Sequence, residues 1–533
     1  MRGTYSSRPE AFRGLPRKAD FGRLGWPHPT DPPHTNRPPR VRRATLTVLA
    51  IASALAALAG VVIRVTTDRG TSVGANVLVD KPGLIEAHNS PSLARDPRLP
   101  DVVVATYRID RPTFSAVLGW SADGGRTWHG TSLPLPPGLD RPYAADAAFG
   151  PDGTLYVIYA NLQGSGNTPA NLWLARSSDG GRTLSAPVRV AGRLAFQARI
   201  AVDQAGVVYV TWLQGTQVGL FELTGPPSSI VESRSSDGAR SFSPPVRVSD
   251  PDRQRVGAAS PVIDSTGRLA VLYEDFKGDQ RDFLDLPGPR WDQPFGLVLT
   301  RPIGLRGFTR GVELESGVLP THRFLVFTPE YPSIAAGPGR TLYVAWSDGR
   351  NGDDDVFLRR SGDGGLTWAA PRRVDNNPIH DGTSQYLPVV SVSPDGRVDV
   401  LFLDRRRDRS HNVMTDATLA SSHDGGASFQ NTRLSSKSFD SRIGSSAAPQ
   451  FPIDFGSQLG LAAGNGQSVA AWTDTRLGSV DTGRQDIFAT TYRAGAAAGG
   501  LSRLPVIGIL VVVALGLAVL ALRTPPAWSG LSA

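Results

Sequence analysis

Two long uncharged stretches stand near the ends of the chain, and short alternating runs of apolar and polar residues fill the region between them. Residues 44–63 contain no charged side chain, and neither do residues 504–522. At the rise of an α-helix, each stretch is about as long as the hydrocarbon core of a bilayer is thick, roughly 30 Å. Neither stretch has a polar face, which argues against a buried core helix. We therefore predict two transmembrane helices.

The region between these stretches repeats a short run of β-favouring residues that ends in an aromatic side chain. Seven such runs end at Tyr107, Tyr159, Trp212, Tyr273, Trp346, Phe402 and Trp472. The chain is rich in turn-forming residues, with 58 Gly and 43 Pro, and Pro-Asp-Gly precedes two of the runs. This pattern predicts seven similar all-β units and no long helix among them.

A second motif marks a turn in most of these units. Its five copies are Ser121-x-Asp123-x-Gly125-x-Thr127-Trp128, Ser177-x-Asp179-x-Gly181-x-Thr183-Leu184, Ser235-x-Asp237-x-Ala239-x-Ser241-Phe242, Ser361-x-Asp363-x-Gly365-x-Thr367-Trp368 and Ser422-x-Asp424-x-Gly426-x-Ser428-Phe429. The carboxylate suits the amides and hydroxyls of a tight turn, and Gly supplies a positive φ. We call this the box motif.

The spacing of the box motifs predicts one unit without a motif. Successive Asp residues are 56, 58, 126 and 61 positions apart, and the doubled gap contains the run that ends at Tyr273. Regular repeats of this kind are typical of a propeller, in which each repeat forms one blade. We predict an all-β, seven-bladed propeller over residues 76–493, with six blades as the alternative.

The seventh unit ends after its third strand, at residues 486–492, and residues 76–80 resemble the strand that follows a box motif. Pairing these two segments would close the ring and remove an open sheet edge. Residues 64–75 and 494–503 are then linkers between the propeller and the two spans.

Charge sets the expected topology. The net charge is +8, and residues 1–43 contain ten Arg or Lys against three acids. Arg40, Arg42 and Arg43 directly precede the first span, which predicts a disordered cytoplasmic tail over residues 1–43, an extracellular propeller and a second cytoplasmic tail over residues 523–533. The alternative is a cleaved signal peptide, because Ala57-Leu58-Ala59 resembles a cleavage site.

Several function classes lack support. The chain has no Cys, so thiol catalysis, thiolate metal sites and disulfides are excluded. The rest of the chain is near neutral, and there is no phosphate-binding loop or paired-His motif, so we expect no nucleic acid, nucleotide, cofactor or metal. Asp353-Asp354-Asp355 is interpreted as a solvated loop, with a calcium site as the less favoured alternative.

The box motif resembles the bacterial neuraminidase repeat, or Asp box, of sialidases and of many non-enzymatic propellers. The resemblance covers residues 76–493 and implies a propeller in which Asp123, Asp179, Asp237, Asp363 and Asp424 serve folding. Sialidases use three arginines, a Tyr/Glu pair and an Asp, and their first arginine usually stands in an Arg-Ile-Pro motif. Residues 88–97 contain no such motif, and sialidases usually have six blades, so no catalytic residue is carried over.

Candidate ligand-binding residues follow the aromatic runs on the side opposite the box motifs. They are the pairs Asp275/Lys277, Asp348/Arg350, Asp404/Arg406 and Asp474/Arg476. Tyr331 and Tyr386, which open the first strands of the fifth and sixth units near the same side, are further candidates. Such a ring of charges suits a carboxylate or polyol ligand, although repetition at equivalent positions favours structural ion pairs. We expect a surface propeller that binds glycan or protein ligands, and the alternative is an exo-acting, sialidase-type glycoside hydrolase.

Overall fold

A computed structural model of the protein describes residues 70–81, 83–164, 167–218, 224–277, 294–319, 330–444 and 455–495. These residues form strands, turns and loops, and no helix among them is long and apolar enough to cross a membrane. The two expected spans, residues 44–63 and 504–522, and both expected tails lie outside the described residues.

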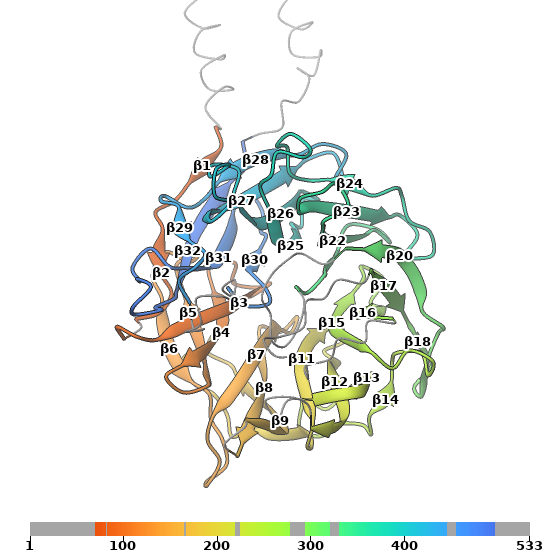
Figure 1. Ribbon diagram of the computed structural model, residues 1–533. Helices are drawn as coiled ribbons and strands as arrows, with labels where there is room; N and C mark the ends of the chain where they lie inside the picture. Colours follow the sequence, from red (N-terminus) through yellow and green to blue (C-terminus); the bar gives the residue numbers. More distant parts are fainter. Residues whose placement is uncertain are drawn as a thin grey trace, which may run out of the picture. The chain divides into compact units, whose positions relative to one another are not determined.

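Seven antiparallel sheets stand side by side around a central axis (Figure 1). Blade 1 contains β3 (Ala87–Arg95), β4 (Val103–Arg111), β5 (Ser115–Ser121) and β6 (His129–Ser132). Blade 2 contains β7 (Pro142–Phe149), β8 (Leu155–Gln163), β9 (Thr168–Ser177) and β10 (Val188–Ala191). Blade 3 contains β11 (Ala195–Val202), β12 (Val208–Val218), β13 (Thr224–Ser235) and β14 (Val246–Arg247).

Blade 4 contains β15 (Val256–Ile263), β16 (Leu269–Asp275), β17 (Phe295–Thr300) and β20 (Val312–Val318), with a hairpin of β18 (Pro302–Ile303) and β19 (Gly307–Phe308). Blade 5 contains β21 (Ser333–Ala336), β22 (Leu342–Asp348), β23 (Asp355–Ser361) and β24 (Arg372–Arg373). Blade 6 contains β25 (Gln385–Val392), β26 (Val398–Asp404), β27 (Met414–Ser422) and β28 (Gln430–Arg433), with β29 (Phe439–Asp440) beside β27. The seven-bladed prediction is confirmed.

The seventh blade is completed by the N-terminal part of the propeller. It contains β30 (Gly460–Ala462), β31 (Ser468–Asp474) and β32 (Asp486–Arg493), and β32 also pairs with β1 (Ser72–Val73) and β2 (Val77–Leu78). Val77 lies opposite Ala489, as the predicted closure requires. Pairing already begins at Ser72, within the expected linker, where Ser72 lies opposite Arg493.

The core lies between neighbouring blades and not within one sheet. Neighbouring blades cover both faces of the second strand in each blade. The strand is therefore buried continuously and not at every other residue, as in Leu342–Asp348, where all seven residues are buried. The aromatic residue near the end of this strand is deeply buried, for example Trp212 and Trp472 at 0% exposure. Tyr273 takes the same place in blade 4, which confirms that the blade without a box motif is present.

The five box motifs form one recurring turn between the third and fourth strands. In the first, the Ser121 hydroxyl donates to Asp123 at 2.8 Å, and the Thr127 hydroxyl donates to the same carboxylate at 2.6 Å. The amide of Gly125 donates to Ser121 at 2.9 Å, with φ at 89°. This arrangement repeats at Asp179, Asp237, Asp363 and Asp424.

The ring has two different faces. The box turns and the turns between first and second strands lie on one face, where the amide of Gly124 donates to the carbonyl of Asp101 at 2.8 Å. We call this the box face. The innermost strands begin at the other face, and the loops after the second strands lie there too; we call it the mouth face. Both ends of the described chain lie on the box face, because β1 pairs with the final residues of β32.

Candidate functional site

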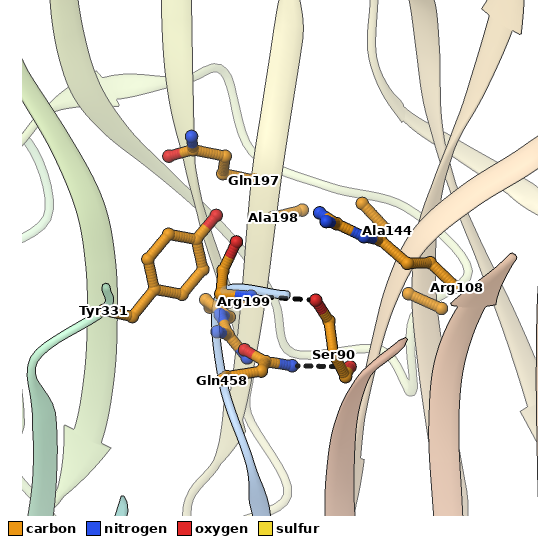
Figure 2. A pocket seen from close by; sticks show the side chains of 10 residues that line it. Ser90, Arg108, Ala144, Gln197, Ala198, Arg199, Tyr331 and Gln458 are labelled. Carbon is orange, nitrogen blue, oxygen red and sulfur yellow. Dashed lines mark hydrogen bonds between the residues drawn. The ribbon is translucent and has the colours of Figure 1, made fainter. Parts of the chain in front are cut away.

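A pocket opens on the mouth face where the innermost strands begin (Figure 2). Its polar lining comes from blades 1 and 3 and from the segments that enter blades 5 and 7, and consists of Ser90, Arg108, Gln197, Arg199, Tyr331, Ser457 and Gln458. The cavity volume is about 40 Å³. Four separate blades therefore supply polar groups to one small pocket, which we call the mouth pocket.

Bulges in the innermost strands shape this pocket. Ser90, Ala144, Gln197, Ala258 and Leu387 occupy the same place in five blades and have φ between 50° and 55°. At each of them the register with the second strand shifts. Bulges and positive φ values in residues other than Gly concentrate near functional sites. The first three of these residues line the mouth pocket.

Close contact between blades 7 and 1 forms one wall of the pocket. The amide of Ser457 donates to the Ser90 hydroxyl at 2.9 Å, and the Gln458 amide group donates to the Ser90 carbonyl at 3.4 Å (Figure 2). A side chain at Gly456 would place its Cβ 2.1 Å from the Ser90 hydroxyl oxygen. Only Gly therefore fits at this position.

Arg108, on β4, is held by a polar network in blade 1. Its Nε donates to the side-chain oxygen of Asn89 at 2.5 Å and lies 3.2 Å from Asp110. The Tyr143 hydroxyl also donates to Asp110 at 2.6 Å. Figure 2 shows the guanidinium reaching into the pocket, across from the ring of Tyr331.

Arg199, on β11, lies between Tyr331 and a carboxylate of blade 2. Its guanidinium carbon stands 4.8 Å from the centroid of the Tyr331 ring, and one of its nitrogens lies 3.6 Å from Asp146. Asp146 also accepts from the Ser92 hydroxyl at 2.7 Å and from the amide of Ile200 at 3.2 Å. The side chain of Arg199 is 15% exposed, so its charge is partly desolvated and lies beside the carboxylate of Asp146.

A larger cavity continues along the axis beneath the mouth pocket. Its volume is about 250 Å³, and it shares Arg199, Tyr331 and Gln458 with the pocket above. Ser92, Ser260 and Ser333 add hydroxyl groups to its wall, and Asp146 adds a carboxyl group. The two spaces together provide a polar channel whose positive charge lies at the upper end.

The predicted Asp-x-Arg pairs form local clamps. In three blades the carboxylate accepts the backbone amide two residues later at 2.8–3.0 Å, and the guanidinium of that residue pairs with the same carboxylate. The acids Asp348, Asp404 and Asp474 are 0–2% exposed. Each of the arginines Arg350, Arg406 and Arg476 therefore binds a carboxylate of its own blade, and Arg350 also pairs with Glu315 of blade 4 at 3.3 Å. None of these six residues lines the mouth pocket. A ligand-binding role for them stays a prediction.

The fourth pair is divided between different partners. The amide of Lys277 donates to Asp275 at 3.1 Å, but its ammonium group pairs with Glu313 at 2.7 Å. Arg253 takes the place of the lysine and pairs with Asp275. The repeated sequence pattern thus does not guarantee one repeated contact.

The two predicted tyrosines have different surroundings. Tyr331 lines both the mouth pocket and the axial cavity. Tyr386 is 2% exposed, packs in the core between blades 6 and 7, and accepts a hydrogen bond from Arg405 at 3.1 Å. Of the ten predicted ligand-binding residues, only Tyr331 lines the mouth pocket.

Buried carboxyl groups lie to one side of the pocket, in blades 4 and 5. Burial, and then the charge of Glu330, raise the pKa of Glu274 well above its ordinary range. The same two causes raise the pKa of Asp354 to about 7. Glu330 itself accepts from the amide of Leu387. None of the described residues that line the mouth pocket carries a carboxyl group.

The interpretation of residues 353–355 as a solvated loop is wrong. Asp354 and Asp355 are buried, and Asp355 accepts from Asn351 at 2.5 Å and pairs with Arg373 at 3.1 Å. Partners within blade 5 thus satisfy Asp355, whereas Asp354 hydrogen-bonds with the Ser384 hydroxyl just before β25 of blade 6. Within the described ranges, no group of three or more His, Cys, Asp or Glu is arranged to hold a metal ion.

Sequence reasoning missed Arg108, Arg199, Gln197 and Gln458. One signal was present for Arg199, which is a charged residue among mostly apolar ones in the run Ala195–Val202. Such a residue faces the axis in a propeller. The bulges that place these residues around one pocket involve no Gly in five blades, so the sequence offers no sign of them.

The architecture and the pocket define a seven-bladed propeller with a cationic polar site on its axis. No family model and no curated protein sequence matches the chain. Solved structures with a similar fold include a Dyadobacter fermentans protein of unknown function, at 12% identity, 80% of this chain, 99% of that chain and a TM-score of 0.42. A Hadza microbial sialidase matches at 19% identity over 59% of this chain and 63% of its own, with a TM-score of 0.39. The phage phi92 endosialidase matches at 12% identity over 81% and 70%, with a TM-score of 0.44.

Proposed function

We propose that the protein is a membrane-anchored, extracellular propeller that binds a small acidic glycan in the mouth pocket and the adjoining axial cavity and does not cleave it. The observation that carries the proposal is the placement of Arg108 and Arg199, from two blades, in one pocket. Guanidinium groups bind carboxylates through charge-assisted hydrogen bonds. Gln197, Gln458 and Ser90 add the polar atoms that a sugar hydroxyl requires.

Binding is favoured over hydrolysis because of what lines the pocket. A glycosidase needs two carboxyl groups about 5–10 Å apart, or a Tyr with a carboxylate helper, at the scissile bond. The described lining of the mouth pocket contains Tyr331 but no carboxyl group. The hydrolase therefore remains the second candidate, supported by Tyr331 and by the single carboxyl group of Asp146 in the axial cavity.

Membrane anchoring in this proposal rests on the sequence. Residues 44–63 and 504–522 are uncharged and long enough to span a bilayer, and the basic residues precede the first of them. The two ends of the propeller lie next to each other, since the amide of Gly495 donates to the Thr71 hydroxyl at 3.2 Å. This proximity supports two spans that are neighbours in the membrane.

A binding experiment tests the pocket. Isothermal titration of the detergent-solubilised full chain with N-acetylneuraminic acid and with glucuronic acid is expected to show binding, whereas glucose is not expected to bind. A hydrogen bond to a charged group contributes about 1.5–3 kcal/mol, so Arg199→Ala is expected to weaken binding by about 10- to 100-fold. Arg350→Ala is the matched control, because Arg350 lies in a clamp outside the pocket. Equal weakening by both variants would contradict the proposal.

A turnover assay separates binding from hydrolysis. The full chain is incubated with a fluorogenic sialoside, and no fluorophore release above background is expected. Release that disappears in Tyr331→Phe and Arg199→Ala, but persists in Arg350→Ala and Arg406→Ala, would establish the hydrolase in place of the binding protein.

A further inference from the structure

The box face of blade 4 carries an exposed apolar hairpin in place of a box turn. Strands β18 and β19 form it, and Gly304 at its turn has a φ of 61°. Ile303 is 62% exposed and Leu305 is 77% exposed. Two large apolar side chains are thus exposed to solvent at the point where the blades that have a box motif form a compact polar turn.

A third exposed leucine lies beside this hairpin. Leu366, in the box turn of blade 5, is 65% exposed. Arg301, at the base of the hairpin, donates to the carbonyl of Gly364 in that turn, so the two turns are in contact. We call Ile303, Leu305 and Leu366 the apolar tip.

Arginines flank the apolar tip. Arg306 is exposed and makes no ion pair with any described residue, and Arg310 is 73% exposed and pairs with Asp252 at 2.8 Å. The area that three apolar side chains can bury is far smaller than the roughly 800 Å² per partner that a stable protein interface buries. A small apolar projection with arginines at its edge instead suits a lipid surface, where the apolar groups enter and the guanidinium groups stay among the phosphates.

The apolar tip and the ends of the propeller share the box face. The hairpin follows the end of β17, where Arg301 pairs with Asp264 of the turn between β15 and β16. The described chain ends at Gly70 and Gly495, beside β1 and the end of β32. Six residues separate Gly70 from the first predicted span and eight separate Gly495 from the second. Extended chains of that length reach only about 20–30 Å, so the box face cannot lie far from the bilayer.

We propose that the apolar tip inserts into the lipid surface and, with the spans, holds the box face flat against the membrane. This inference rests on the membrane anchoring of the proposed function. Blade 4 stands three blades from blade 7 by the shorter way around the ring, so the two attachments fix the plane of the propeller. The mouth pocket then faces away from the bilayer, toward ligands outside the cell.

The mouth face supplies a matched comparison. Leu84 and Val480 are 77% and 74% exposed, as much as the residues of the apolar tip. They lie in loops next to each other, since Arg111 donates both to the carbonyl of Ile85 and to that of Thr482. If exposure alone brought side chains into contact with lipid, these residues would behave in the same way as the apolar tip.

The absence of Cys allows a direct test in the full chain. Leu305→Cys, Leu366→Cys, Leu84→Cys and Val480→Cys are each labelled with an environment-sensitive fluorophore. Each protein is reconstituted into vesicles of phosphatidylcholine and phosphatidylglycerol that carry nitroxide-labelled lipid in both leaflets. Quenching is expected to be severalfold stronger at positions 305 and 366 than at 84 and 480. Adding Ile303→Asp is expected to reduce the quenching at position 366.

The outcomes separate the two proposals. If alkaline carbonate releases the chain from the vesicles, the anchoring is wrong and the lipid contact of the apolar tip falls with it. If the chain stays embedded but quenching is equal at all four positions, or stronger at 84 and 480, only the apolar-tip proposal is overturned.

Discussion

At the scale of single residues, the repeated Asp-x-Arg pattern stabilises the turn that follows the second strand of a blade. The carboxylate of Asp474 accepts the amide of Arg476 at 2.8 Å, and the arginine folds back so that its guanidinium meets the same carboxylate. An Asp at the start of a turn commonly accepts the amide two residues later. The pattern therefore recurs because each loop after a second strand needs the same turn, and recurrence by itself does not indicate a ligand site.

The clamp leads to a prediction about stability. Asp474 is 0% exposed, and the side chain of Arg476 is 8% exposed and stacks on Phe488 at 4.4 Å. Removing one partner of a buried pair leaves an unpaired charge, so Arg476→Ala is expected to reduce the free energy of unfolding by about 3–5 kcal/mol. Urea unfolding followed by tryptophan fluorescence measures the change.

An exposed pair provides the control for that prediction. Arg442 is 68% exposed and pairs with Asp440 at 2.7 Å. Exposed pairs contribute about 0–1 kcal/mol, so Arg442→Ala is expected to have little effect. Similar losses in the two variants would show that burial of Asp474 does not determine the cost.

Asp354 gives a prediction about pH. Burial and the nearby Glu330 raise its pKa to about 7, above the ordinary value of 3.8. Between these two values the folded protein holds a proton that the unfolded chain has lost, so stability falls as pH rises from about 4 to 7. Asp354→Asn removes this loss, and the variant is expected to be more stable than the wild type at pH 7.5 by on the order of 4 kcal/mol, with little difference at pH 4.

Thermal unfolding from pH 4 to pH 7.5 measures that difference. Asp481→Asn, in an exposed loop, serves as the control and is expected to follow the wild type. The groups that face Asp354 are Glu330, Arg405, Asp353 and the Ser384 hydroxyl, and an Asn side chain keeps a hydrogen-bonding partner for the last of them. A constant difference between wild type and Asp354→Asn across this pH range would contradict the assignment.

At the scale of strands and turns, the sequence predicts what local chemistry determines. The box turns were predictable because the hydrogen bonds of the Asp carboxylate and the Ser hydroxyl join residues within a few positions of each other, such as Ser422, Asp424 and Ser428. The second strands were predictable because both of their faces are covered. The bulges at Ser90 and Gln197 were not, because they depend on contacts with the neighbouring blade, and the amide of Ala258 donates to Gln197 from blade 4.

A box turn is expected to respond to acid. The hydrogen bond from the Ser428 hydroxyl is the main cause that lowers the pKa of Asp424 to about 2, below its ordinary value of 3.8. The stabilisation by the carboxylate is therefore complete above about pH 4 and is lost as the pH falls toward 2. Asp424→Ala is expected to cost about 1 kcal/mol at pH 7 and clearly less at pH 2, where about half of the carboxyl is protonated in the folded protein. Urea unfolding at both pH values tests this, and an equal cost at both would refute it.

At the scale of the whole molecule, repetition made the fold easier to predict than the site. Seven aromatic runs and a missing last strand indicated the number of blades and the closure, and the pairing of Val77 with Ala489 confirmed the closure. The mouth pocket needs Arg108, Arg199, Tyr331 and Gln458 from four blades to meet at the axis. Such a meeting depends on the angle between blades, which no local sequence pattern records, so only Tyr331 was found in advance.

Ring closure gives the last prediction. The amide of Val79 donates to the carbonyl of Ile487 at 2.9 Å, and its side chain is buried with Val103 and Trp128 of blade 1. Val79→Pro removes this donor, whereas Val79→Ala keeps it and loses only part of the packing. Because the closing segment joins the last blade to the first, we expect Val79→Pro to increase hydrogen exchange in both β32 and β3, and Val79→Ala to do so much less. Hydrogen exchange measured by mass spectrometry tests this prediction. Loss of protection in both β32 and β3 would show that the N-terminal strands stabilise the closed ring. Loss confined to β2 would contradict the prediction and would make the closing segment a peripheral addition.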